Sequence, residues 1–289
     1  MKIGKTIRNI RLSKNLKSKN IYDGILSRPA ISRFERGLSD TTTEKFFKIL
    51  NNLNISLEEF HFIYNNYQIE EEYLFWEEYA QAFYTNDIKK MQKLKHIKNQ
   101  KYKKTKKINQ LHYSALCELT SNYISGTQSD KKSLDILKTY LLECEEWTYY
   151  ELVLFTNSLD FFSEELIIIL YERTKKKLEE YTLLKKYNNE VFSLLSNILV
   201  IFITNNNSQN CAFFYNELSN SISETKNKMY DKVMLAFFKE LIEMMNSKTY
   251  DEKKIEGVIS LFTNLDMSFK AIQCTNLFET VKKNNEKSK

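Results

Sequence analysis

The most chemically distinctive part of the chain is a run of cationic side chains within residues 27–37, which read Ser-Arg-Pro-Ala-Ile-Ser-Arg-Phe-Glu-Arg-Gly. On a helix, the arginines of this run would lie on the side opposite Ile31 and Phe34. Guanidinium groups form paired hydrogen bonds with phosphates and other planar acceptors. The segment therefore predicts a helix with one apolar face and one anion-binding face, although a short solvated surface helix would show the same pattern.

The ends of this helix are marked by three residues. Ser27 is a suitable N-cap, because its hydroxyl oxygen can accept a hydrogen bond from a free amide of the first turn. Pro29 fits the first turn, where its missing N–H loses no hydrogen bond. Gly37 can adopt the left-handed conformation that ends a helix. A helix over residues 28–36 is therefore expected.

The charge of the chain is concentrated around this helix. Residues 1–66 contain twelve Lys or Arg and six Asp or Glu, so they carry the whole net charge of +6. The remaining residues contain equal numbers of basic and acidic side chains. A small basic module joined to a larger neutral region is typical of proteins that bind a polyanion.

Four further short helices are expected around residues 28–36. Apolar spacing predicts helices over 3–14 and 18–25. Two capping-box patterns, Thr41-x-x-Glu44 and Ser56-x-x-Glu59, predict the starts of a fourth and a fifth helix. Five short helices with a basic third helix form the five-helix version of the helix-turn-helix arrangement.

Residues 1–66 resemble the Xre/Cro-type DNA-binding domain. The resemblance rests on Gly4-x-x-Ile7-Arg8-x-x-Arg11, on Ile31-Ser32-Arg33-Phe34-Glu35-Arg36-Gly37, and on Phe46-x-x-Ile49-Leu50-x-x-Leu53-x-Ile55-x-x-x-Glu59-Phe60. The second string is more specific and is similar to the Rgg/GadR/MutR regulators of low-GC Gram-positive bacteria. In those proteins this domain precedes a helical-repeat domain that binds short pheromone peptides. Beyond residue 66 the resemblance rests on length, helical character and segment 147–157.

The resemblance implies that residues 28–36 are the recognition helix. Arg28 and Arg33 would then face base edges, since arginine is the commonest bidentate reader of guanine. Ser32 and Arg36 would contact phosphates, which position a protein without reading sequence. Pro29 departs from the polar residue usual at its position, so one base contact is lost or replaced by apolar contact with a thymine methyl group.

The resemblance also implies a structural ion pair inside this domain. Glu35 matches an internal acid of the domain, which pairs with the arginine of the first helix, here Arg11. Removing one partner of a buried pair strands a desolvated charge and costs about 3–5 kcal/mol. We therefore expect this pair to hold the recognition helix in place.

Residues 67–289 are expected to form a second, all-α domain. Five Gly and one Pro are too few for a chain rich in hairpins. Every second helix start recurs at an interval of roughly 40 residues, a period typical of helix-pair solenoids. No repeat consensus is visible, so the prediction is a degenerate tetratricopeptide-like α-solenoid. The expected helices are 70–84, 87–98, 108–124, 131–144, 147–159, 163–180, 187–204, 209–225, 228–247, 251–264 and 268–283.

Four residues of this region are candidates for peptide binding. Asn157 and Asn197 are both ten residues into an expected helix, which places them one repeat apart on equivalent faces. An asparagine amide can both donate to and accept from a peptide bond, and related peptide-sensing regulators hold peptide backbones in this way. Tyr150 and Glu151 could add a pocket wall and a charge. Alternatively, all four are ordinary core or surface residues.

Residues 89–107 contain ten lysines and no acidic residue. This run could contact DNA phosphates. The alternative is a solvated helix end and loop facing acidic side chains at residues 70–72 and 77–78. The position of the run inside the second domain favours this alternative.

The sequence gives no indication of an enzyme, a metal site or a cofactor. The three histidines are isolated, no glycine-rich phosphate loop is present, and no nucleophile–base pair stands out. Four widely spaced cysteines indicate free thiols in a reducing cytoplasm rather than zinc ligands or disulfides. No apolar run approaches the roughly 20 residues of a membrane span, and no signal-peptide core is visible at the N-terminus.

The sequence therefore predicts a cytoplasmic, homodimeric, sequence-specific regulator of transcription that binds double-stranded promoter DNA. The resemblance implies control by a short hydrophobic signalling peptide bound in the repeat domain. Two alternatives stay open at this point. One is a helical-repeat adaptor that no longer reads DNA, and the other is a DNA-binding regulator without a peptide ligand.

Overall fold

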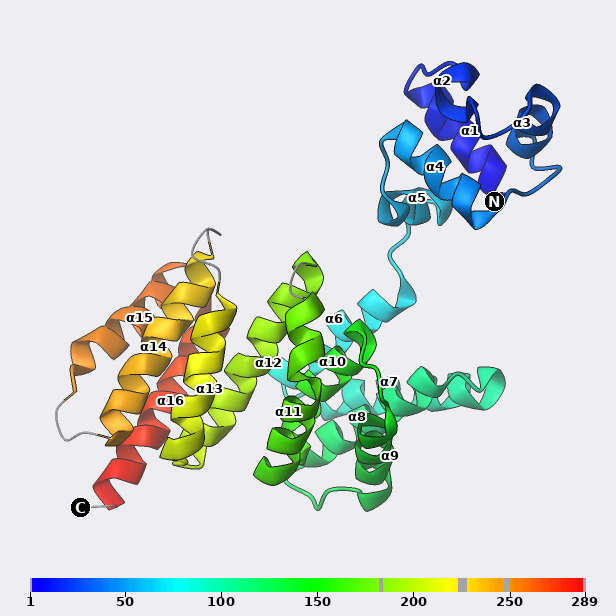
Figure 1. The fold of residues 1–289 in the computed structure, drawn as a ribbon. Coiled ribbons are helices and arrows are strands. Elements are labelled where there is room, and N and C mark those ends of the chain that lie inside the picture. Colours follow the sequence, from blue (N-terminus) through cyan, green and yellow to red (C-terminus); the bar gives the residue numbers. More distant parts are fainter. Residues whose placement is uncertain (1, 182–183, 223–227, 247–249, 288–289) are drawn as a thin grey trace. The chain divides into compact units, whose positions relative to one another are not determined.

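The structure, a computed structural model, describes residues 2–181, 184–222, 228–246 and 250–287. Within these residues the chain forms helices and short connecting segments, with no strand. It is an all-α protein in which a helix-turn-helix domain precedes a domain of successive packed helices (Figure 1). Among the described helices, none combines the length and the apolar character needed to cross a membrane.

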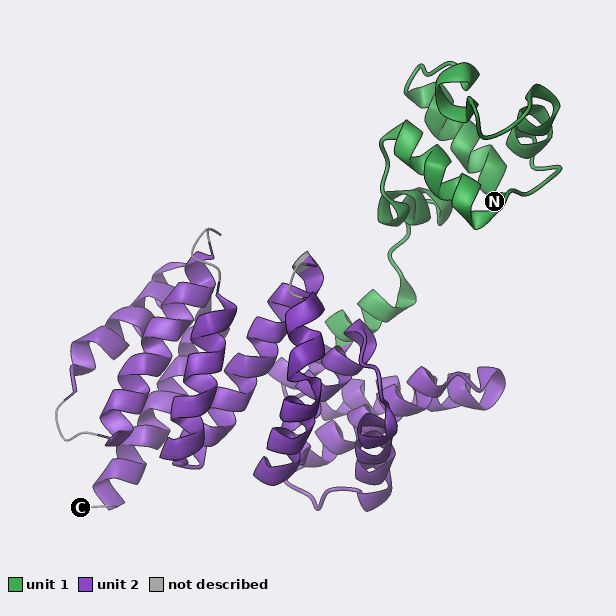
Figure 2. Ribbon diagram, viewed as in Figure 1, with its two compact units in different colours: residues 1–78 green, residues 79–289 purple. Residues whose placement is uncertain are grey.

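The chain divides into two compact units, residues 1–78 and residues 79–289 (Figure 2). The division falls inside helix α6 (Glu71–Tyr84), which contributes residues to both units. The sequence predicts a boundary after residue 66, two residues beyond the end of the fifth helix at Tyr64. The two units are described separately below as unit 1 and unit 2.

Unit 1 contains five short helices around one apolar core (Figure 1). They are α1 (Ile3–Ser13), α2 (Ser18–Tyr22), α3 (Arg28–Glu35), α4 (Thr43–Leu53) and α5 (Leu57–Tyr64). The core is formed by Ile7, Ile10, Ile21, Tyr22, Phe34, Ile49, Leu50, Leu53 and Phe60. Every helix contributes at least one of these side chains, so burial of apolar area holds the five helices together.

Of the two capping boxes predicted in unit 1, one is present at the predicted residues, and at the other the N-cap is shifted by one residue. Ser56 and Glu59 form the predicted capping box of α5, with Glu59 N donating to Ser56 Oγ at 3.1 Å and Ser56 N donating to Glu59 Oε2 at 2.7 Å. The predicted Thr41 box is wrong by one residue, because Thr42 caps α4 by accepting a hydrogen bond from Lys45 N. The second helix ends at Tyr22, three residues earlier than predicted, and Gly24 follows with φ +70°.

Unit 2 is built from helices that pack on their neighbours in the chain. They are α7 (Ile88–Thr105), α8 (Ile108–Ser125), α9 (Lys131–Glu143), α10 (Tyr149–Thr156), the 3₁₀ turn η1 (Leu159–Phe161), α11 (Glu164–Tyr181), α12 (Lys185–Thr204), α13 (Ser208–Ser221), α14 (Met229–Asn246), α15 (Glu252–Asn264) and α16 (Ser268–Lys287). Helix α12 is central, since it also contacts α10, α14 and α16. Nearly every predicted helix of this region is present.

Two helices of unit 2 differ from the prediction in ways that matter for function. Helix α7 continues to Thr105, so most of the lysine run is helical rather than a loop. Its buried residues Met91, Leu94 and Lys98 recur at helical spacing, so one face of α7 packs against the rest of unit 2. Helix α10 ends at Thr156 instead of residue 159, because the chain turns into η1.

All four cysteines are free thiols. Cys117, Cys211 and Cys274 are buried, and Cys144 is half-buried. Burial raises the pKa of the Cys117 thiol. The three buried thiols pack as small apolar groups in the helical domain.

Candidate nucleic-acid interface and ligand-binding region

Helix α3 turns its cationic side to solvent. The side chains of Arg28, Pro29, Ser32, Arg33 and Arg36 are exposed. The Arg36 side chain bonds within the helix, where Nε donates to the Ser32 carbonyl oxygen at 3.2 Å. Arg28 and Arg33 form no hydrogen bond or ion pair with the residues that the structure describes. Two guanidinium groups are therefore available to an external partner.

The opposite side of α3 is held by a buried ion pair. Arg11 Nε donates to Glu35 Oε1 at 2.7 Å, and Arg11 Nη2 donates to Glu35 Oε2 at 2.9 Å. Both residues are only 8% exposed. The bidentate hydrogen bond to Glu35 raises the pKa of Arg11. The two residues lie where the sequence predicted the structural pair between the first and third helices.

Two further hydrogen bonds complete this cluster. The Tyr22 hydroxyl donates to Glu35 Oε1 at 2.8 Å, and Arg11 Nη1 donates to the Leu16 carbonyl oxygen at 2.9 Å. Burial and the hydrogen bond to Glu35 raise the pKa of Tyr22, which stays a neutral donor. Tyr22 was not identified from the sequence, since nothing in its local spacing links it to Glu35. The cluster joins α1, α2 and α3 through one carboxylate.

Glycines fix the approach of α3 to α1 and the end of α3. A Cβ atom on Gly4 would lie 1.8 Å from the Phe34 carbonyl oxygen, so only glycine allows the two backbones to come this close. Gly37 adopts φ +69° and ends the helix as predicted. The Lys2 ammonium group donates a hydrogen bond to the Gly37 carbonyl oxygen at 2.7 Å. Ser27 precedes α3 at the N-cap position, although its side chain makes no capping hydrogen bond.

The geometry of α3 suits a duplex nucleic acid. An eight-residue helix with one face locked into a core and the other carrying free guanidinium groups can enter a groove and reach both base edges and phosphates. This is the arrangement that helix-turn-helix domains use. The predicted DNA contacts therefore share one exposed face of one rigid element.

In unit 2, the structure places Glu151 at the start of α10 as a buried acceptor. The Tyr140 hydroxyl donates to Glu151 Oε1 at 2.5 Å, while Thr148 N and Thr148 Oγ1 donate to Oε2 at 2.8 and 2.7 Å. Burial opposes ionisation, but the hydrogen bonds from Tyr140 and Thr148 hold the pKa of Glu151 below its ordinary value. Both carboxylate oxygens thus accept hydrogen bonds from the protein itself.

Tyr150 belongs to the same polar network through His112. The Nδ1 atom of His112 lies 2.7 Å from the Tyr150 hydroxyl, and the His112 ring centroid lies 4.2 Å from that of Tyr140. His112 is buried, which lowers its pKa to about 4. The imidazole is therefore neutral at physiological pH. The sequence did not identify His112, because it is a single histidine without a ligand-like spacing.

The two asparagines do not occupy equivalent helical positions. Asn157 is the C-cap of α10, is half-buried, and donates from Nδ2 to the Val153 carbonyl oxygen at 2.8 Å. Asn197 is exposed in the interior of α12. The argument from equal phase is wrong, because α10 ends earlier than predicted and α12 begins earlier. That these residues bind a peptide remains a prediction.

Two hollows open on the surface of unit 2. A hollow of about 640 Å³ between α8 and α9 is lined by His112 and Tyr140, which border the network around Tyr150. A larger groove of about 770 Å³ lies between α14 and α15. None of the four residues predicted to bind a peptide lines either hollow.

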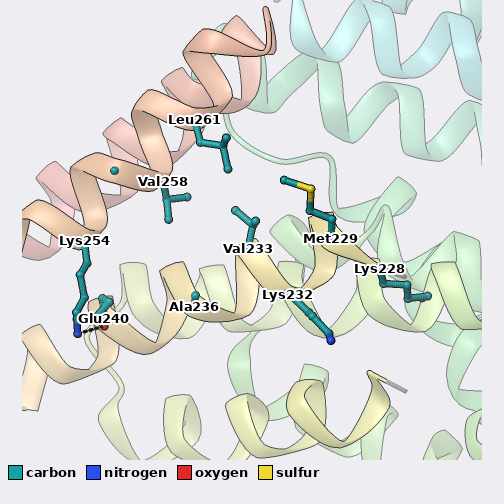
Figure 3. A pocket seen from close by; sticks show the side chains of 10 residues that line it. Lys228, Met229, Lys232, Val233, Ala236, Glu240, Lys254, Val258 and Leu261 are labelled. Carbon is teal, nitrogen blue, oxygen red and sulfur yellow. Dashed lines mark hydrogen bonds and ion pairs between the residues drawn. The ribbon is translucent and has the colours of Figure 1, made fainter. Parts of the chain in front are cut away.

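The larger groove has apolar walls. Val233 and Ala236 face Val258 and Leu261 across it, and Lys254 Nζ donates to Glu240 Oε1 at 3.0 Å across one end (Figure 3). Gly257 also lines the groove, and a Cβ atom there would meet no other atom within 4 Å. A glycine inside a helix is destabilising relative to alanine, and here it leaves the groove open.

Comparison with known proteins agrees with this architecture. The family described as "HTH-type transcriptional regulator Rgg, C-terminal domain" matches residues 91–276, and a helix-turn-helix family matches residues 7–60.

Three solved structures illustrate the similarity of fold. A putative transcriptional regulator from Listeria monocytogenes EGD-e has 24% identity over 98% of both chains and a TM-score of 0.84. The SHP pheromone receptor Rgg2 from Streptococcus dysgalactiae has 19% identity, covering 96% of this chain and 99% of its own, with a TM-score of 0.74. A bacterial peptide pheromone/receptor complex has 15% identity, covering 97% of this chain and 98% of its own, with a TM-score of 0.67.

Proposed function

The chain belongs to the Rgg family of helix-turn-helix transcriptional regulators, and from this premise we propose that it reads a specific promoter sequence under the control of a short hydrophobic peptide. The observation that carries the DNA-reading part is the exposed guanidinium face of α3, held from behind by the Arg11–Glu35 pair. Arg28 and Arg33 contact base edges. Ser32 and Arg36 contact phosphates, and Pro29 offers at most an apolar contact.

We infer that the active form is a homodimer in the cytoplasm, where the chromosome is. One eight-residue helix spans only a few base pairs. Two half-sites about one helical turn apart raise both affinity and specificity to useful levels. The operator is therefore expected to be an inverted repeat that mirrors the twofold symmetry of the dimer.

The peptide part of the proposal is supported by the fold of unit 2. Solved structures with the same fold include a protein described as a pheromone receptor and one described as a peptide pheromone/receptor complex. Asn197 is exposed and Asn157 half-exposed, so both amides can reach a ligand. The α14–α15 groove adds apolar walls that suit hydrophobic side chains. Peptide binding regulates only if the peptide has different affinities for two arrangements of the protein.

The DNA-reading part is tested with DNA from upstream of the protein's own gene. Wild-type protein should bind this duplex more tightly than a scrambled duplex of equal length and composition. Arg28→Ala with Arg33→Ala should abolish that preference while leaving the helical circular dichroism signal intact. Wild-type discrimination by the double variant would exclude α3 as the reading element, and a wild type that binds no DNA would favour the adaptor alternative.

The peptide part is tested with a synthetic peptide encoded by a short reading frame next to the gene. Asn157→Ala and Asn197→Ala should each weaken binding in a calorimetric titration. Gly257→Leu places a larger side chain in the α14–α15 groove, and its Cβ atom would meet no other atom. Weaker peptide binding in this variant would show that the peptide uses the groove, independently of the two asparagines. Unchanged affinity in all three variants would remove these residues from the site. No binding to wild type would favour a regulator without a peptide ligand.

A further inference from the structure

Helix α7 carries a second cationic surface outside the helix-turn-helix unit. We define the α7 lysine stripe as Lys89, Lys93, Lys103 and Lys104, all of which are exposed. At 100° per residue these four side chains lie within one narrow face of the helix. The buried residues Met91, Leu94 and Lys98 lie on the opposite face, which fixes the stripe toward solvent.

The stripe lies in a long segment of the chain that contains no acidic residue. Residues 88–117 contain ten lysines and no Asp or Glu. Several other lysines of unit 2 are paired with carboxylates, as the ion pairs Lys175–Glu217 at 2.7 Å and Lys228–Asp231 at 2.8 Å illustrate. The four ammonium groups of the stripe make no hydrogen bond or ion pair within the described part of the chain.

The shape of the stripe fits an extended anion. Residues 89 to 104 rise about 22 Å along the helix axis. In Figure 1 the end of α7 and the start of α8 form a projecting hairpin tip, where Lys106 and Lys107 are also exposed. A rod of flexible, strongly hydrated ammonium groups binds phosphates as point charges, whereas it has no means of reading bases.

We propose that the α7 lysine stripe binds the phosphate backbone of duplex DNA and adds a sequence-independent contact to the one made by α3. The proposal goes beyond the promoter reading assigned to unit 1, because it gives the repeat domain a direct part in DNA affinity. An acidic protein surface is the rival partner. Duplex DNA is favoured because the same chain carries a DNA-binding unit and because its phosphates form a continuous anionic line.

The test uses the full chain and a long fluorescent duplex of mixed sequence, with affinity measured by anisotropy over a series of salt concentrations. The test variant replaces the four stripe lysines by glutamine, Lys89→Gln, Lys93→Gln, Lys103→Gln and Lys104→Gln. Each lost phosphate contact should flatten the plot of log affinity against log salt by about 0.9. We expect a change in slope of about 2–4 and an affinity loss of at least about tenfold at low salt.

A matched control changes the same charge elsewhere in unit 2. Lys131→Gln, Lys138→Gln, Lys176→Gln and Lys253→Gln also remove four exposed lysines. This control should keep the wild-type slope and an affinity within about twofold of wild type, since only the position of the charge differs. Equal behaviour of the two quadruple variants would overturn the proposal.

The remaining outcomes also discriminate. If the stripe variant changes only self-association, as measured by sedimentation, and binds DNA like the control, the partner is an acidic protein surface and the proposal is wrong. The proposed promoter reading fails separately, because it is measured as discrimination between two duplexes and not as affinity for mixed-sequence DNA.

Discussion

Helices α3 and α10 are both eight residues long and are both fixed by a buried carboxylate, yet their surroundings differ completely. Glu35 accepts hydrogen bonds from the Arg11 guanidinium group, and the opposite face of α3 is exposed to solvent. Glu151 accepts only from neutral donors, and α10 is buried from Glu151 to Thr156. A buried carboxylate therefore fixes an exposed helix in unit 1 and a buried helix in unit 2.

The comparison separates a helix that presents a surface from a helix that organises a core. In α3, an ion pair behind the helix holds guanidinium groups in front of it for a partner. In α10, hydrogen bonds from Tyr140 and Thr148 fix a helix that packs on α12. We expect substitutions at Glu35 to affect DNA reading through the orientation of α3, and substitutions at Glu151 to affect the stability of unit 2.

The largest effect is expected for Glu35→Gln. The amide leaves the buried Arg11 guanidinium group without a counter-charge, which should cost unit 1 about 3–5 kcal/mol. A domain of this size has little more stability than that. Hydrogen exchange of peptides from α1 to α5 measures the loss. The matched control, Glu44→Gln, removes an exposed pair with Lys48 and should leave the stability of unit 1 close to that of wild type, because solvent screens such a pair. Equal losses in the two variants would show that the Arg11–Glu35 pair is not the element that fixes α3.

The next effect concerns pH and His112. Its folded pKa of about 4 is below the ordinary 6.5, so the unfolded chain takes up a proton that folded unit 2 excludes. Stability should therefore fall as the pH is lowered from about 6.5 to about 4, by roughly 3 kcal/mol from this residue. Urea denaturation of wild type and His112→Gln at several pH values measures this contribution to the free energy of unfolding. The variant should lack the part of the pH dependence that comes from His112.

The control for this prediction is His96→Gln, because His96 is exposed and its ring nitrogen lies 2.7 Å from Gln100 Nε2 on the same helix. That variant should keep the wild-type dependence on pH. A His112→Gln protein with an unchanged slope would mean that the imidazole is already protonated or solvated in the folded unit.

A smaller effect is expected for Glu151→Gln. The amide cannot accept all three hydrogen bonds from Tyr140 and Thr148, so α10 loses its cap and unit 2 loses about 1–2 kcal/mol. The loss is smaller than at Glu35 because no buried cation is stranded. Chemical denaturation measures the free energy of unfolding of Glu151→Gln and of the control Glu145→Gln, whose side chain is exposed in wild type. A loss as large as that of Glu35→Gln would remove the distinction between the two helices.

The sequence predicted what depends on local signals. Helix α3 could be placed because a capping position, an early proline and a terminal glycine surround a clear apolar spacing. The start of α5 could also be predicted, because the Ser56–Glu59 capping box is a local signal. The partner of Glu35 could be named only through the resemblance to a known domain, since Arg11 is 24 positions away in the chain.

The rest depends on contacts between distant segments. Nothing near Tyr22 or His112 in the sequence indicates which carboxylate or hydroxyl each one meets. The pairing of Asn157 with Asn197 failed because an error of three residues in the end of α10 moved Asn157 from a helix interior to a C-cap. The α14–α15 groove is lined by residues of two helices, so its apolar walls appear only once these helices are packed.

The central claim is that α3 reads bases through bidentate guanidinium groups, and one substitution pair tests it most directly. Arg28→Lys with Arg33→Lys keeps both charges but removes the paired hydrogen bonds. Wild-type protein first selects its preferred duplex from a randomised pool. Binding of wild type and variant to this duplex and to a scrambled one is then compared at one salt concentration.

The account predicts that the lysine variant binds the scrambled duplex nearly as tightly as wild type, because the phosphate contacts persist. It should lose discrimination by roughly 1–3 kcal/mol for each arginine that reads a base, which is about 5- to 160-fold per position. A variant that keeps the wild-type preference for the selected duplex would contradict the claim that Arg28 and Arg33 read the sequence.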